Sequence, residues 1–205
     1  MIQIPREILE LHRLASDDST RQALNSIYFD INRAVVTNGH HLTALEHGIP
    51  VLDTVLFEKI PPDRSWPDAK TTSMLIPKGI AESILKGATK HCLFSLEVFP
   101  LQGEIEISRY DTKSDQRLKL RFDIDYTGYP DIDQVIKQKS DYDDLESTGL
   151  CGLSLKYLSD FFKYLKAVKA PWGGMFRQKS DLDPVRIDVD TGFGALTFVL
   201  MPIRI

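Results

Sequence analysis

The chain has 205 residues, of which 42% are hydrophobic and 26% charged, and its formal net charge at pH 7 is −4. This composition is ordinary for a globular protein that buries a core. The net negative charge argues against a general nucleic-acid binder, although one surface can still be basic. The sequence contains no run of 18 apolar residues, so it predicts no membrane span. Residues 1–12 lack the layout of a signal peptide.

The first predicted element is a helix, because Ile8, Leu11 and Leu14 recur at helical spacing after Pro5, a residue suited to a first helical turn. Strand-like runs follow at 26–30, 33–36 and 40–46, with Asn38-Gly39 as a turn. The next segment, 48–70, contains four prolines and predicts an irregular spacer with one short strand at 51–57.

A second helix is predicted after Pro77, with apolar residues at Ile80, Ile84 and Leu85 and a stop at Gly87. Strands are predicted at 92–98, 104–109 and 117–124, and alternation in the last of these predicts one exposed and one buried face. The following polar segment, 137–149, reads as a linker. Its acidic residues are better explained by solvation than by a metal site: Asp141, Asp143, Asp144 and Glu146.

A third helix is predicted after Ser154, which we expect to cap it, because its apolar residues again have helical spacing: Leu158, Phe161, Phe162, Leu165 and Val168. Strands are predicted at 174–177, 185–189 and 195–201. The chain therefore reads as three repeats of a strand, a helix and an antiparallel meander, an α+β fold. The apolar end, Met-Pro-Ile-Arg-Ile, is expected to dock rather than fray.

Catalytic patterns are not found. His40 and His41 are adjacent on a predicted strand and point to opposite faces, so they do not readily hold one ion. The sequence has no Walker A motif, no G-x-S-x-G, no H-E-x-x-H and no cysteine pair with zinc spacing. Cys92 and Cys151 predict buried free thiols in a reducing compartment. We expect a cytoplasmic protein that is not an enzyme and has no metal or cofactor.

Several segments, in order along the chain, resemble the bacterial DNA polymerase III beta subunit, the sliding clamp. RQALNSIYFD, VTNGHHLTA, MLIPK and GYPDIDQVI, within residues 21–136, resemble its middle domain. LSLKYLSDFFKYLKA and VLMPIRI, within residues 153–205, resemble the second half of its C-terminal domain. The resemblance implies the DNA-clamp (processivity) fold, with a complete two-module domain at 1–136, a linker at 137–149 and a half domain at 150–205.

The resemblance also implies a pocket for a short peptide motif carried by polymerases and clamp loaders. The matching positions are Leu24, Thr37, Gly39, His40, His41, Leu42, Pro130, Val135, Val199, Met201, Pro202, Ile203 and Arg204. The family's usual TDGHRL is TNGHHL here, with Asn38 and His41, and a frequent arginine is Gln134. These departures predict a somewhat different peptide preference. The alternative is that these residues only pack the junction between modules.

A sliding clamp offers basic side chains from the helices that line its hole, through contacts with phosphates that carry no sequence information. The candidates are Arg6, Arg13, Lys78, Lys86, Lys156, Lys163 and Lys166, and the alternative for them is an ordinary solvated helix face. Three modules cannot enclose duplex DNA, so we expect a homo-oligomeric ring, a tetramer rather than a trimer.

Two other interpretations stay open at this point. A phage or mobile element could encode a truncated clamp mimic that captures clamp-binding partners without forming a ring. An unrelated α+β binding module could match these motifs by accident.

Overall fold

The computed structural model describes residues 1–30, 32–47, 73–99, 102–123, 129–136, 152–171, 173–179 and 183–202. Its first module comprises β1 (Ile2–Ile4), α1 (Arg6–Glu10), the 3₁₀ helix η1 (Leu11–Leu14), β2 (Ser26–Asp30), β3 (Arg33–Thr37) and β4 (His41–Glu46). The second comprises β5 (Ser73–Pro77), α2 (Lys78–Leu85), β6 (Cys92–Phe99), β7 (Glu104–Asp111) and β8 (Gln116–Asp123). After a short helix, α3 (Ile132–Val135), the third comprises α4 (Leu155–Ala167), β9 (Met175–Arg177), β10 (Val185–Asp190) and β11 (Ala195–Leu200).

The three predicted helices are confirmed, and so are the nine predicted strands that fall on described residues, with bounds that shift by one or two residues. Two expectations need correction. Ser154 occupies the N-cap position of α4, but its side chain makes no capping hydrogen bond. Cys92 is a free thiol that is half-buried rather than buried. The predicted spacer with its strand at 51–57, the linker at 137–149 and Cys151 lie outside the described residues.

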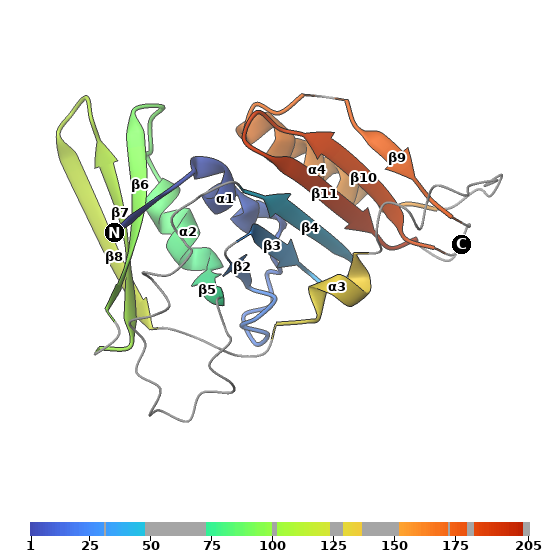
Figure 1. Ribbon diagram of the computed structural model, residues 1–205, viewed down its shortest axis with the longest axis horizontal. Helices are drawn as coiled ribbons and strands as arrows, with labels where there is room; N and C mark the ends of the chain where they lie inside the picture. Colours follow the sequence, from blue (N-terminus) through green and yellow to red (C-terminus); the bar gives the residue numbers. More distant parts are fainter. Residues whose placement is uncertain are drawn as a thin grey trace.

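Two antiparallel sheets hold the modules together. One has the order β1-β6-β7-β8 and the other the order β5-β2-β3-β4-β11-β10-β9 (Figure 1). The first two modules exchange strands, because β1 pairs with β6 of the second module and β5 pairs with β2 of the first. The third module joins through β11, which pairs with β4. The seven-stranded sheet therefore runs from the second module through the first to the third.

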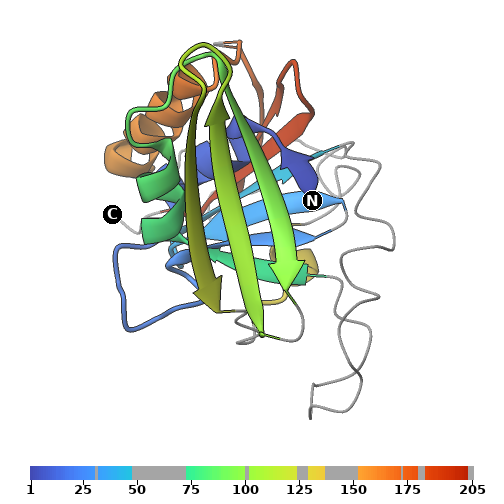
Figure 2. The ribbon, with the colours of Figure 1, turned by 90° about the vertical axis from the view of Figure 1, so that its left-hand side faces the viewer.

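The helices form a layer against the sheets. Helix α1 contacts α2, and η1 contacts α4, so the helices of all three modules are neighbours. Figure 2 shows α2 and α4 along the same side of the molecule. A single core of buried residues lies between this layer and both sheets, and it includes Ile8, Leu9, Ile84, Phe161 and Phe198. Burial of these apolar side chains is the main force that holds the layer in place.

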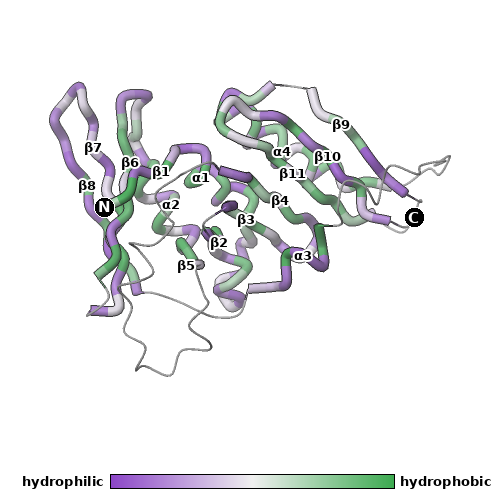
Figure 3. The backbone as a smooth tube through the Cα atoms, viewed as in Figure 1, coloured by the Kyte–Doolittle hydropathy of each residue, from purple (hydrophilic) through white to green (hydrophobic). Residues whose placement is uncertain are grey.

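Strand β8 shows how alternation in the sequence becomes two faces. Leu118, Leu120 and Phe122 pack against the core, while the residues between them are exposed. Figure 3 shows the resulting alternation of hydrophobic and hydrophilic residues along this strand. Within the described part of the chain, no helix is long and apolar enough to cross a membrane.

Candidate functional site

The turn between β3 and β4 is held by its own polar side chains. Asn38 accepts hydrogen bonds at Oδ1 from the backbone N–H groups of His40 and His41, at 2.9 and 3.1 Å. The Thr37 hydroxyl donates to the His41 carbonyl at 2.6 Å and accepts from the Gly39 N–H at 3.1 Å. Gly39 has a φ of +88°, which disfavours residues with a Cβ. The Thr-Asn-Gly sequence therefore builds a rigid turn.

The C-terminal strand lies directly beside this turn. In the β4–β11 ladder, Leu42 is opposite Val199 and His41 is opposite Leu200. One residue further on, the backbone N–H of Met201 donates to the carbonyl oxygen of His40 at 3.0 Å. Segments that are about 160 residues apart in sequence thus meet at one place. The Met201 side chain is 42% exposed there, a large apolar group in contact with solvent.

A small apolar cluster lies on the face of the sheet away from the helices. Its buried members are Val35, Leu42, Ala44 and Ile132, and its partly buried members are Tyr28, Tyr129, Val135 and Ile136. Because opposite residues of an antiparallel pair share a face, Val199 lies on the same side as Leu42. We call this set, with Val199, the outer cluster. It brings together residues from the first module, α3 and the last strand.

Helix α3 borders the outer cluster and was not predicted. Asp131 caps it by accepting hydrogen bonds from the backbone N–H groups of Asp133 and Gln134. The Gln134 side chain donates to the other oxygen of Asp131 at 2.9 Å. An aspartate after a proline is a recognisable helix-start signal, and it could have revealed this helix despite its four residues.

Tyr129 anchors the segment that leads into α3. Its hydroxyl donates to the carbonyl of Val35 at 3.3 Å, and its ring lies 4.9 Å from that of Tyr28. Burial raises the pKa of Tyr129, so the phenol stays protonated and remains a donor. Tyr129 and Ile132 therefore belong to the site, although neither was among its predicted residues.

His41 is placed differently from the other predicted pocket residues. It is buried on the helix side of the sheet, opposite the outer cluster, with its ring 5.3 Å from both Tyr157 and Phe198. Burial lowers the pKa of His41 to about 4, so the imidazole is neutral at pH 7. His40 is exposed, and its ring also contacts Tyr157, on which it stacks with 5.5 Å between the ring centres. Tyr157 was not predicted as part of the site.

The remaining predicted positions fall into three groups. Pro130 is exposed next to Tyr129, and Pro202 is half-buried next to Met201. Leu24 lies in the loop before β2, where its carbonyl accepts from Ser16, and it does not belong to the outer cluster. Ile203 and Arg204 lie outside the described residues.

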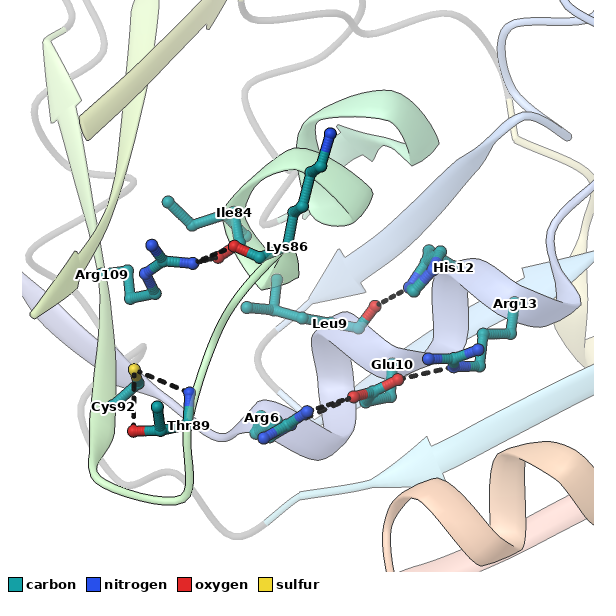
Figure 4. Close-up of polar contacts among 10 residues, drawn as sticks. All are labelled: Arg6, Leu9, Glu10, His12, Arg13, Ile84, Lys86, Thr89, Cys92 and Arg109. Carbon is teal, nitrogen blue, oxygen red and sulfur yellow. Dashed lines mark hydrogen bonds and ion pairs between the residues drawn. The ribbon is translucent and has the colours of Figure 1, made fainter. Parts of the chain in front are cut away.

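The predicted basic helix residues lie on the helix layer, but several are already paired with acids. Glu10 is 1% exposed and binds Arg6 and Arg13 at 3.0 and 2.6 Å (Figure 4). Burial opposes ionisation of Glu10, but the hydrogen bonds and charges of Arg13 and Arg6 outweigh it and hold the pKa of this carboxyl below its usual value. Lys78 pairs with Asp17, and Lys163 pairs with Asp160.

The other three basic candidates differ in exposure and pairing from Arg6, Arg13, Lys78 and Lys163, which are paired with acids. Lys86, Lys156 and Lys166 are exposed and make no ion pair with any described residue. The Lys156 ammonium lies 6.0 Å from the centre of the Tyr157 ring. Where η1, α2 and α4 meet, a cavity of about 250 Å³ is lined by three basic residues, two acidic residues and a histidine: Arg13, Lys78, Lys163, Glu82, Asp160 and His12. The helix face is therefore mixed in charge rather than uniformly basic.

No cluster of three or more metal-ligating side chains occurs among the residues that the structure describes. No protein-family model matches the sequence, and a comparison with curated proteins finds no match. The structure, by contrast, is similar to solved sliding clamps.

The DNA polymerase sliding clamp of Bacillus subtilis is 15% identical, with a TM-score of 0.62, over 100% of this chain and 64% of that chain. The beta sliding clamp of C. crescentus is 16% identical, with a TM-score of 0.51, over 100% of this chain and 65% of that chain. Proliferating cellular nuclear antigen of Entamoeba histolytica is 11% identical, with a TM-score of 0.60, over 97% of this chain and 94% of that chain. The chain thus spans about two thirds of the bacterial clamps, and it has the DNA sliding-clamp fold.

Proposed function

We propose that this chain is a cytoplasmic, non-enzymatic DNA sliding clamp, a polymerase processivity factor that encircles duplex DNA as a homo-oligomer. The observation that carries the proposal is the clamp fold over the whole chain, with β11 paired to β4 beside the Gly39 turn. A clamp holds DNA by topology, so its contacts with phosphates can be weak and nonspecific. The mixed charge of the helix layer is compatible with a weak grip.

We propose that polymerase and clamp-loader peptides bind at the outer cluster and the adjoining Met201 and Pro202. The cluster offers Val135 as a half-buried apolar side chain, supported by the buried Leu42 and Val199, and Met201 is a flexible side chain, 42% exposed, that can adapt to a ligand. The backbone of the Gly39 turn supplies polar groups that can orient an extended peptide. His41 does not belong to this surface, because its ring lies on the other side of the sheet.

Ring closure requires further copies of the chain. In the described residues, the edge strands are β1 and β8 of one sheet and β5 and β9 of the other, and β8 and β9 lie at opposite ends of the module series. Strand β9 exposes Met175 and Phe176, each at 58%, and exposed apolar side chains on a sheet edge favour association. We propose that the β8 and β9 edges join one copy to the next. Four chains of three modules then give the twelve modules of a bacterial clamp ring, which favours a tetramer over a trimer.

A second candidate is a truncated clamp mimic, encoded by a phage or mobile element, that captures clamp-binding partners without encircling DNA. The pairing of Arg6, Arg13, Lys78 and Lys163 with carboxylates favours it, since these side chains are less available to phosphates. Native mass spectrometry at micromolar concentration separates the two. A ring predicts four times the 23.3 kDa of one chain, whereas a monomer would favour the mimic.

A further inference from the structure

Two kinds of contact join the three modules. The first and second modules exchange their leading strands, because β1 pairs with β6 and β5 pairs with β2. The first and third modules instead pair their last strands, β4 and β11. We call these the exchange contact and the end contact. In each of them, the two modules use the same side of their fold, so the contact resembles one between two copies related by a two-fold axis.

Each of the outer modules keeps one of these sides unused in the described part of the chain. The second module makes the exchange contact, and its last strand, β8, is an edge strand. The third module makes the end contact, and β9, the strand that corresponds to β6, is an edge strand. Figure 1 shows β8 and β9 at opposite ends of the molecule. One chain therefore offers an end-contact side at β8 and an exchange side at β9.

Strand β9 exposes an aromatic residue on the core side of its sheet. Phe176 is opposite Ile187, a buried core residue, and so lies on the same face, yet it is 58% exposed. The corresponding strand of the second module, β6, buries Phe94, which is 3% exposed and lies opposite Ile4 of β1. The exchanged strand thus covers in the second module the surface that is uncovered in the third.

Helix α4 provides a second and independent observation. Counted from the lysine near the start of each helix, Lys78 or Lys156, Phe162 corresponds to Ile84 of α2. Ile84 is fully buried in a module whose helix packs against α1, whereas Phe162 is 38% exposed. Leu155 lies about two turns before Phe162 on the same side of α4 and is 80% exposed. Exposed large apolar side chains at one site mark an interaction surface.

The other side of α4 is already covered by the first module. Tyr164 is fully buried, and its hydroxyl donates to the carbonyl of Glu7 in α1 at 3.4 Å. Residues two apart on an α-helix point to nearly opposite sides, so Phe162 is directed away from that contact. Within one chain, Leu155 and Phe162 therefore lie on the side of α4 that faces away from the first module.

We propose that the third modules of two chains complete one two-module domain by an exchange contact across a two-fold axis. Each copy places residues 152–154 beside β9 of the other, and Leu155 and Phe162 of the two α4 helices pack together. Residues 152–154 precede α4 as β1 precedes α1, and they form no strand of their own. This inference rests on the proposed homo-oligomer and names the surface through which two copies meet.

The contact determines the symmetry of the assembly. Because like sides pair, β8 meets β8 of another copy, and exchange and end contacts alternate around a ring of four chains. Such a tetramer has two different two-fold interfaces. A head-to-tail ring, in which β9 of one copy meets β8 of the next, has only one kind of interface. Breaking one interface therefore gives different products in the two rings.

Native mass spectrometry of the double variant Phe162→Asp, Phe176→Asp tests the inference. The variant should form dimers of twice 23.3 kDa, because the β8 interface persists, while the unchanged chain forms tetramers. Leu93→Asp, at a residue 47% exposed on the interior strand β6, should keep the tetramer. Monomers or tetramers of the double variant would overturn the inference and leave the homo-oligomer standing. If the unchanged chain is a monomer, the homo-oligomer and the inference are both wrong.

Cross-linking provides a test that does not depend on breaking the contact. A residue near a two-fold axis meets its own copy, and Ser159 is exposed on α4 between the two exposed apolar residues. With Cys92→Ser and Cys151→Ser, the variant Ser159→Cys should give a covalent dimer with a short bismaleimide. Ser114→Cys, at an exposed position in the β7–β8 turn, should give none. Absence of the Ser159→Cys dimer in a chain that is oligomeric would contradict the two-fold contact.

Discussion

The backbone N–H of Met201 donates to the carbonyl of His40 at 3.0 Å, and this bond extends the β4–β11 ladder to the Gly39 turn. It places Met201 beside a turn that its own side chains hold in shape before any ligand arrives. A preorganised site loses less conformational entropy on binding. The proposed peptide site depends on this single junction between the first and third modules.

Ending the chain after Leu200 should reduce peptide affinity by more than tenfold. The change removes Met201 and its bond to His40 but keeps every paired residue of β11. The fold should therefore persist, with unchanged circular dichroism and little loss of stability. Calorimetry with a synthetic clamp-binding peptide measures the affinity. Equal affinities of the full and shortened chains would show that the C-terminal residues do not contribute to the site.

Replacing Lys156, Lys163 and Lys166 together with glutamate should weaken retention on circular DNA while leaving peptide affinity unchanged. All three are exposed on α4, and Lys156 and Lys166 make no ion pair with a described residue. The control makes the same charge change near the β7–β8 turn, at Lys90, Lys113 and Arg117, all of them exposed. Retention is measured at low salt, where phosphate contacts are strongest. An equal loss from both triple variants would exclude a specific role for α4.

Gly194→Ala should destabilise the protein by about 2 kcal/mol or more, a cost typical of overpacking. A Cβ at this position would lie 1.9 Å from the backbone oxygen of Glu46, so the β10–β11 hairpin would have to move away from β4. Gly192→Ala is a matched control in the same hairpin, because a Cβ there meets nothing within 4 Å. Urea unfolding of both variants measures the difference. Similar stabilities would argue against the close contact between the hairpin and β4.

His41 should make the protein less stable as the pH falls from 7.5 to 5. Burial holds its folded-state pKa at about 4, below its value near 6.5 in the unfolded chain, so the unfolded state binds the proton first. The stabilisation is complete above pH 6.5 and is lost as the pH falls toward 4. At pH 5 the expected loss is about 2 kcal/mol.

His41→Phe should remove this part of the pH dependence while keeping aromatic contacts with Tyr157 and Phe198. His91→Gln, at an exposed position, should change nothing. Urea midpoints at pH 7.5 and 5.0 provide the comparison. His12 and His47 also have lowered pKa values, so the informative quantity is the difference between the wild type and His41→Phe. No difference between them would mean that His41 is accessible to protons in the folded state.

Periodicity in the sequence predicted the elements well where apolar residues repeat. The helical spacing of Ile80, Ile84 and Leu85 and the alternation of Leu118, Leu120 and Phe122 correspond to the faces that the structure buries. Helix α3 was missed because four residues are too few for a periodic pattern, and only the Asp131 cap marks it. We expected a strand before the helix of the third module. Among the described residues, a single residue at that place, Gly152, forms a bridge instead.

Contacts between distant segments were harder to predict. The alternation of strand residues already implies that His41 and Leu42 face opposite ways, yet both were assigned to one pocket on the basis of the family resemblance. The pairing of Glu10 with Arg6 and Arg13 follows helical spacing and could have been anticipated. The hollow lined by Asp30, Arg33, Glu46 and Asp133 could not, since it joins residues from β2, β3, β4, α3 and the β10–β11 hairpin.

Topological retention on DNA tests the central claim most directly. The protein is mixed with linear duplex DNA that is biotinylated at both ends, streptavidin then blocks the ends, and the DNA is washed at high salt. A closed ring that has threaded onto the duplex should stay bound through the wash and leave when a restriction enzyme opens a free end, because salt removes only the electrostatic contacts. Loss of the protein during the wash, with the ends still blocked, would contradict the account.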